Sequence, residues 1–239
     1  MIGLGTLINV ACILAGGVAG LFGRRLLVPR VQETLMKATG LCVIFVGLAG
    51  TLEEMLPVKD GALTSGGTAM MIVSFAVGSA IGELIDLDSR FVRLGKWLKE
   101  KTGSEGDAGF VNGFVNASLT VSIGAMAIVG AIQDGIAGDW GTLALKGALD
   151  AVIVCVMSAS FGRGCLFSAL PVAVIQGSIT LLAQPIRPIM TEAALSNLSL
   201  VGSMLIFCVG VNLIWKGTFK PANMLPAVVI AVIWALVVP

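Results

Sequence analysis

Residues 141–161 read GTLALKGALDAVIVCVMSASF, and this stretch decides the class of fold. Its length suffices to cross the hydrocarbon core of a bilayer, which takes about 20 apolar residues. Two charged residues interrupt it, Lys146 and Asp150, and they are four positions apart. Because residues at that spacing share one helix face, we predict a transmembrane helix that carries an ion pair.

Similar apolar stretches recur along the chain, separated by short clusters of charge. Hydrophobic residues make up 56% of the sequence and charged residues only 12%, whereas a soluble domain has about 25% charged residues. We therefore predict an all-α, polytopic membrane protein with about eight transmembrane helices in a single transmembrane domain, 1–239. The expected helices are 3–22, 37–54, 66–86, 109–132, 141–161, 165–183, 196–215 and 221–238.

The composition also argues against several functions. The sequence has no His and a net charge of +1, which excludes histidine metal ligands and histidine proton relays. The five cysteines lie in or beside apolar stretches without a CxxC motif, so they are expected to be packing residues. There is no basic domain and no cofactor or nucleotide motif. We expect a protein that is not an enzyme, needs no cofactor and binds no nucleic acid.

The charged clusters alternate in sign along the chain. Basic residues follow the first, third, fifth and seventh expected helices, whereas acidic residues follow the second, together with Lys59, and the fourth. Only Arg187, between the sixth and seventh, lies on the wrong side. The basic residues are Arg24, Arg25, Arg30, Lys37, Arg90, Arg93, Lys96, Lys99, Lys101, Arg163, Lys216 and Lys220; the acidic loops hold Glu53, Glu54, Asp60, Asp134 and Asp139. Because basic loops stay in the cytoplasm, we predict an inner-membrane protein with both termini on the outer side.

The connection 87–107 has the pattern of an amphipathic helix on the cytoplasmic surface. Apolar residues recur at helical spacing, while basic residues fill the other face between positions 90 and 101. Such a helix is held by anionic lipid headgroups. The alternative is a solvated linker.

Weak internal similarity suggests a repeat. The motifs GxxxL, PxxxE and IFVG at 17–47 return at 177–210, where the third reads IFCVG and follows about one helical turn later. If residues 1–86 match 164–239, the two three-helix units have opposite orientation and flank a central helix pair, 108–163. Inverted repeats are frequent in secondary transporters. A parallel repeat and a chance match remain alternatives.

The buried polar residues are candidates for a binding site, because a charge at the bilayer centre costs at least about 2.5–3.5 kcal/mol. Lys146 and Asp150 form either a cation or proton site or a structural ion pair. On the expected helix 109–132, Asn116 and Thr120 share one polar stripe, and Ser118 and Ser122 share a neighbouring one. Such a stripe lines a pathway or bonds a neighbouring helix. Gln133 and Asp134 close the outer end of this helix.

The expected helix 165–183 is the predicted location of a helix break. Pro171 removes a backbone donor, and Gly162 and Gly164 precede it; an ordinary proline kink is the alternative. Gln176 lies nearby, and Asn9 of the first helix is expected to complete the site by symmetry.

Two GxxxG motifs, Gly16 with Gly20 and Gly78 with Gly82, permit close helix contact. They predict either packing within the chain or the interface of a homodimer.

Several motifs carry a family resemblance. They are GTLIN at 5–9, GG at 16–17, GAMAIVGA at 124–131, QDG at 133–135 and LFSALP at 166–171, together with the spacing of Lys146 and Asp150. In these motifs the chain resembles the YqgA/YdfK-like family of bacterial inner-membrane proteins, a domain-of-unknown-function family. The resemblance implies a location and no reaction.

The residues therefore favour a small secondary transporter whose site lies between the expected helices 109–132, 141–161 and 165–183. Coupling of this transport to a cation is part of the hypothesis. The alternatives are an ion or solute channel and a membrane scaffold that only binds partners. The expected ligand is a small solute or cation, and the sequence does not identify a metal.

Overall fold

The computed structural model describes residues 2–26, 28–59, 61–122 and 124–238. It confirms an all-α membrane fold, to which a short hairpin of β1 (Val58–Lys59) and β2 (Ala62–Leu63) is added. The helices are α1 (Leu4–Leu26), α2 (Pro29–Met55), α3 (Thr68–Ile85), α4 (Leu87–Lys101), α5 (Phe110–Ser122), α6 (Ala125–Ala137), α7 (Gly141–Phe161), the 3-10 helix η1 (Arg163–Ser168), α8 (Ala169–Leu181), α9 (Ala183–Ile186), α10 (Glu192–Ile214), α11 (Pro221–Met224) and α12 (Pro226–Val237).

Among the described residues, six helices are long and apolar enough to cross a membrane: α1, α2, α3, α7, η1 with α8, and α10. The bent pair α5–α6 makes a seventh if it counts as one span. The eighth expected span is present as the apolar stretch Pro221–Val237, which is shorter than the others. Eight crossings therefore stay a prediction, as does the internal repeat.

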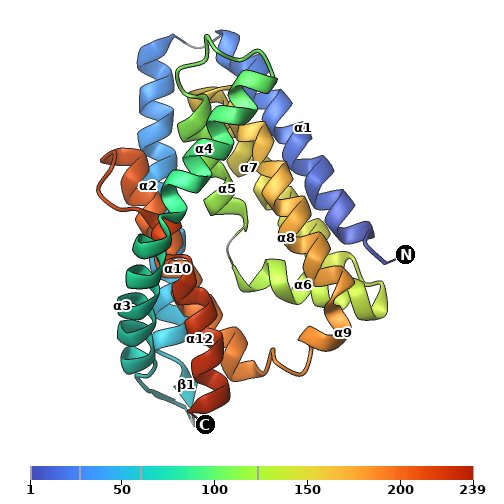
Figure 1. Cartoon of the computed structure of the whole chain (residues 1–239), viewed down its shortest axis with the longest axis vertical. Helices are drawn as coiled ribbons and strands as arrows, with labels where there is room; N and C mark the ends of the chain where they lie inside the picture. Colours follow the sequence, from blue (N-terminus) through green and yellow to red (C-terminus); the bar gives the residue numbers. More distant parts are fainter. Residues whose placement is uncertain (1, 27, 60, 123, 239) are drawn as a thin grey trace.

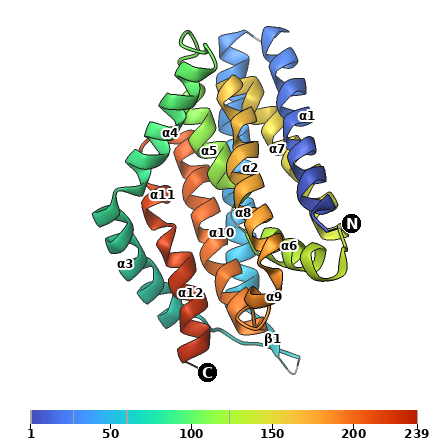
Figure 2. The same ribbon diagram turned by 45° about the vertical axis from the view of Figure 1, so that its right-hand side comes forward.

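Two groups of helices lie side by side. Figure 1 and Figure 2 both show α1, α7 and α8 on one side of the bundle and α3 with α12 on the other. The most extensive helix contacts join α1 to α7 and α2 to α10. Both termini lie away from the end where α1 meets α2 (Figure 1). Which side of the membrane each end faces stays a prediction, and residue Asp60 of the expected outer loop lies outside the described residues.

The two GxxxG motifs form seams within the chain. A Cβ atom added to Gly16 would lie 2.2 Å from the Ala151 carbonyl oxygen of α7. A Cβ atom added to Gly82 of α3 would lie still closer, 1.8 Å from the Asn223 carbonyl oxygen of α11. These glycines let helix backbones within the chain touch. They therefore give no support to the homodimer, which stays a prediction.

One predicted helix is wrong. The sequence predicts an unbroken helix over 109–132, but the structure divides it into α5 and α6, whose axes are bent by 63°. Gly124 stands at the break with a φ of +140°, which L-residues rarely adopt. Residue 123 lies outside the described residues. After the break, α6 turns across the bundle to pack on α8 and α7 (Figure 1).

The connection 87–107 contains the helix α4, which packs on α5. Leu98 and Gly95 are buried there, and Leu98 joins a cluster with Phe110 and Phe114. The helix begins after Asp86, whose carboxylate accepts a hydrogen bond from the Ser89 N–H at 3.4 Å. This bonding to Ser89 holds the pKa of Asp86 below its usual value.

The outer face of α4 has the predicted amphipathic character. Arg90, Arg93 and Lys96 are exposed. Leu94 and Trp97, which belong to the predicted apolar face, are 45% and 52% exposed beside them. An exposed surface with this mixture suits the boundary between headgroups and acyl chains.

Candidate functional site at the helix break

The centre of the site is the ion pair on α7. The Lys146 ammonium contacts the Asp150 carboxylate, and the two side chains are only 8% and 7% exposed. Lys146 Nζ also donates a hydrogen bond to the Val121 carbonyl oxygen of α5 at 2.7 Å. The pair predicted from the spacing is therefore formed, and it is joined to the end of the broken helix.

This contact follows from where α5 stops. The last carbonyls of a helix lack intrahelical partners and carry the negative end of its dipole. α5 ends at Ser122, one residue after Val121, so the Lys146 ammonium satisfies a carbonyl near that end. A continuous helix would have used the same carbonyl for its own ladder.

Two amide side chains extend the polar site to α1 and α8. Asn9 packs against Gly147 of α7, where an added Cβ would lie 3.0 Å from the Asn9 Cα, and its side chain neighbours Asp150. Asn9 Nδ2 donates to Gln176 Oε1 at 3.2 Å. The structure therefore brings together four predicted residues from three helices.

Several polar atoms in this interior have no hydrogen-bond partner among the described residues. They are Asn9 Oδ1, Gln176 Nε2 and the hydroxyl oxygens of Ser118, Ser122 and Ser158. A buried polar group without a partner costs about 1–3 kcal/mol. Such atoms are the groups to which a water, ion or solute would bind.

A cavity of about 200 Å³ opens on the other side of the break. Ser118, Ser122 and Gly124 line it from α5 and the break, and Pro171 lines it from α8. Its remaining wall is apolar and includes Phe91 of α4. The last turn of α5 therefore contacts the ion pair through the Val121 carbonyl and supplies Ser122, one of two unpartnered hydroxyls in this cavity.

A second cavity, of about 340 Å³, lies farther along α5 toward its start. Asn112 and Asn116 line it, with Lys216 and Lys220 across from them. Leu119 lines both cavities and is only 2% exposed. It therefore separates them.

Charges at this second cavity are shifted by their surroundings. Desolvation raises the pKa of Asp88, which lines the cavity. The hydrogen bond to Glu83 raises the pKa of Lys220. The Lys220 ammonium at this cavity is therefore held in an ion pair with Glu83, whose carboxylate lies 2.6 Å from its Nζ.

Other predicted residues have local partners. Thr120 donates to the Asn116 carbonyl at 2.8 Å, and Asn116 donates to the Asn112 carbonyl at 2.9 Å. The exposed Gln133 accepts from Thr142 at 2.7 Å, away from the ion pair. Part of the polar stripe of α5 therefore forms hydrogen bonds to backbone carbonyls of α5 itself.

Asp134 has a different position from the one expected. It is fully buried and accepts hydrogen bonds from the N–H groups of Gly3, at 3.2 Å, and Gly5, at 3.0 Å. α1 begins at Leu4, so this carboxylate caps its N-terminus. The structure does not bring Asp134 to the ion pair.

The predicted break residues mark the turn between α7 and α8 rather than the break itself. Pro171 is in the first turn of α8, where its missing N–H is tolerated. Gly162 has a φ of +96°, and an added Cβ would meet the Arg24 guanidinium at 1.6 Å. Gly164 packs on the Phe110 carbonyl of α5. These glycines let η1, α1 and α5 meet.

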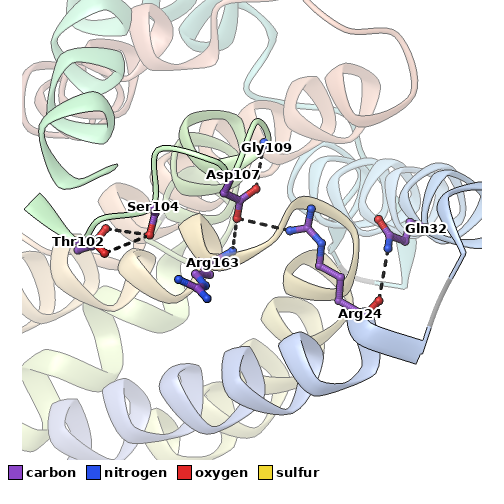
Figure 3. Close-up of polar contacts among 7 residues, drawn as sticks. All are labelled: Arg24, Gln32, Thr102, Ser104, Asp107, Gly109 and Arg163. Atoms are coloured by element: carbon purple, nitrogen blue, oxygen red, sulfur yellow. Dashed lines mark hydrogen bonds and ion pairs between the residues drawn. The ribbon is translucent and has the colours of Figure 1, made fainter. Parts of the chain in front are cut away.

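Figure 3 shows the polar cluster at that turn. The Asp107 carboxylate accepts the Arg163 backbone N–H at 2.9 Å and the Gly109 N–H at 3.2 Å, and it pairs with Arg24 at 3.5 Å. One carboxylate therefore ties α1, η1 and the start of α5 together.

Three further groups of the site had sequence signals of unequal strength. Ser118 was visible as part of the polar stripe of α5. Gly124 was the only signal of the break in its neighbourhood. The Val121 carbonyl carries no side-chain signal at all. In the described residues there is no group of three or more His, Cys, Asp or Glu that could hold a metal ion.

Comparison with known proteins places these features in a family context. The family described as "Protein of unknown function (DUF554)" matches residues 4–236. The uncharacterized membrane protein YdfK of Bacillus subtilis is 28% identical over 226 residues, covering 95% of this chain and 93% of its own. The uncharacterized protein YqgA of Escherichia coli is 25% identical over 235 residues, covering 95% and 94%. No solved structure matches.

Proposed function

Since this chain belongs to the family of proteins of unknown function DUF554, we propose a function from its site: a secondary transporter of a small solute or ion, coupled to a cation. The observation that carries the proposal is the break between α5 and α6, where Lys146 of the buried ion pair binds a carbonyl at the end of α5.

Discontinuous helices are a recurrent device of secondary transporters. Their free backbone ends and dipoles bind substrates and ions near the middle of the membrane. Charged residues within transmembrane helices commonly mark such pathways. The break, Asp150 and the cavity with Ser118 and Ser122 together supply a cation site beside a solute site.

The ion pair also supplies a means of coupling. While Lys146 neutralises Asp150, the pair needs no external ion. A cation or proton at Asp150 would release Lys146, and with it the Val121 carbonyl at the end of α5. Cation binding would thereby act on the break itself, and Gly124 at the break lines the cavity that contains Ser118 and Ser122.

The first test is binding to the purified protein. Na⁺, K⁺, Li⁺ and a panel of small metabolites are screened for a rise in unfolding temperature, since a ligand at a hundredfold excess over its dissociation constant stabilises by about 2.7 kcal/mol. We expect a hit that Asp150→Asn abolishes. The matched control is Glu33→Gln, because Glu33 pairs with Lys37 at the same spacing on the surface. An equal hit in Asp150→Asn would contradict the role of Asp150.

The second test separates a transporter from a channel. The ligand found in the first test is assayed for uptake into proteoliposomes under an imposed gradient of the coupling cation. Saturation and counterflow would support alternating access. Flux that rises linearly with concentration, without counterflow, would instead indicate a channel, and no flux would indicate a scaffold.

We also propose a location in the inner membrane with both termini outside, as the basic loops indicate. Alkaline phosphatase fused after the last residue should be active, because this reporter needs the outer side. An inactive fusion that is made in normal amounts would overturn the orientation.

A further inference from the structure

Two adjoining cavities lie where α1 meets η1 and α8, away from the site proposed above. The first, of about 470 Å³, is an apolar groove between α1 and α8, with Val10, Leu14, Leu170 and Ala173 among its lining residues. The second, of about 510 Å³, is polar and contains Arg24 and Asp107. Leu21, Ser104 and Arg163 line both cavities. An apolar groove therefore runs directly into a polar pocket.

The groove opens to lipid. Its two walls, Leu4–Arg24 and Arg163–Leu181, are both candidate membrane spans. Leu14 and Leu170 are 42% and 49% exposed. From Val10 to Leu21 the wall extends about 16 Å at 1.5 Å per residue, which is about the depth of one leaflet of a 30 Å hydrocarbon core.

The polar end of the groove carries an unneutralised cation. Asp107 already binds Arg24 and the Arg163 backbone N–H. Figure 3 shows the Arg163 guanidinium pointing away from Asp107, and within the described residues it has no ion-pair partner. Ser104, a residue 5% exposed, lines the same pocket, and its hydroxyl accepts a hydrogen bond from the Thr102 hydroxyl at 3.1 Å and donates to the Thr102 carbonyl oxygen at 3.5 Å (Figure 3).

We propose that this groove binds one anionic phospholipid, with an acyl chain between α1 and α8 and its phosphate on Arg163 and Ser104. The occupant of an apolar groove walled by two membrane spans comes from the bilayer, and the free guanidinium selects a negative headgroup. The site is separate from the exposed basic face of α4, because Arg90, Arg93 and Lys96 line neither of the two adjoining cavities. The proposal does not depend on transport.

The experiment counts tightly bound lipids on the purified protein by native mass spectrometry. Phosphatidylglycerol and phosphatidylcholine with the same acyl chains are added in turn. We expect one phosphatidylglycerol molecule to be retained by the wild type and to bind about fivefold more weakly to Arg163→Gln, because one charge near the surface is removed. Arg187→Gln, which removes an exposed arginine outside the groove, is the matched control and should bind normally.

A second variant tests the acyl-chain part without changing charge. Ala173→Trp fills the groove and should also remove the bound lipid, while the unfolding temperature without lipid shows that the protein is folded. Undiminished binding in Arg163→Gln or in Ala173→Trp, or equal retention of phosphatidylcholine, would overturn the proposal. Displacement of the lipid by millimolar inorganic phosphate would likewise overturn it, because the pocket would then be a site for free phosphate.

Discussion

Two lysine–carboxylate pairs in this molecule have the same spacing and opposite surroundings. Glu33 and Lys37 on α2 are joined at 2.8 Å, with side chains 61% and 56% exposed. Lys146 and Asp150 on α7 are 8% and 7% exposed. Each pair places an acid and a base four residues apart, in opposite order along the chain, and the large difference between the pairs is their burial.

The comparison shows what a buried pair requires. Exposed partners are solvated and screened, so either can be lost at little cost. Buried partners depend on each other, because an unpaired charge in the interior is strongly unfavourable. Lys146 additionally donates a hydrogen bond to the Val121 carbonyl. Among the described residues, Lys37 of the surface pair has no such contact with another helix. The same local spacing therefore serves helix solubility in one place and holds a helix break in the other.

The largest effect is expected when the buried pair is broken on one side. Lys146→Met keeps much of the side-chain volume but leaves Asp150 and the Val121 carbonyl unpaired. We expect the free energy of unfolding to fall by about 3–5 kcal/mol, measured by denaturant titration in detergent. A loss below about 1 kcal/mol would mean that water already solvates the pair.

A smaller effect is expected when both charges are removed together. Lys146→Met with Asp150→Leu leaves no unpaired charge, so the remaining cost is mainly that of the unpartnered Val121 carbonyl, about 1–3 kcal/mol. The double-mutant cycle should therefore show favourable coupling between the two residues. Additive losses would show that they act independently.

Removing the unpartnered hydroxyls of α5 should affect ligand binding but should not lower the free energy of unfolding. Ser118→Ala with Ser122→Ala removes two buried hydroxyl groups without partners, so the protein should be unchanged or more stable by about 1 kcal/mol. Ligand-induced stabilisation should nevertheless fall, because both residues line the cavity at the break. Ser158→Ala is the control, since Ser158 is also unpartnered but lines none of the cavities at the break. If the ligand stabilised both variants equally, the cavity at the break would not be the place where the ligand binds.

The smallest effect is expected at the surface pair. Glu33→Gln should leave the unfolding temperature within the error of a thermal-shift measurement at ordinary salt concentrations, because solvent and ions screen the exposed pair. The wild type and the variant should converge as salt is raised. A large loss would show that the pair is not free in the membrane environment.

Much of the fold could be predicted from hydropathy, because each span needs a continuous apolar stretch. The pairing of Lys146 with Asp150 was also predictable, since helical spacing alone brings them together. The break between α5 and α6 was not. Its neighbourhood stays apolar and lacks proline, so Gly124 gave a weaker signal than Pro171, which lies harmlessly in the first turn of α8.

The role of Asp134 was hidden for a different reason. Its charge in an outer loop predicted a residue near the end of a span, but its partners are at the start of the chain. Sequence spacing describes neighbours on one helix, whereas Asp134 and α1 meet only through packing. The same holds for Asn9 and Gln176, whose contact joins residues on α1 and α8.

The cap that Asp134 provides also has a consequence for biosynthesis. Gly3 and Asp134 are 131 residues apart in the chain. At about 5–20 residues per second, the ribosome needs roughly 7–25 s to make the carboxylate after it has made the amides. During that interval α1 is in the translocon or the membrane with its first N–H groups uncapped, and it docks in its final place only after more than half of the chain has emerged.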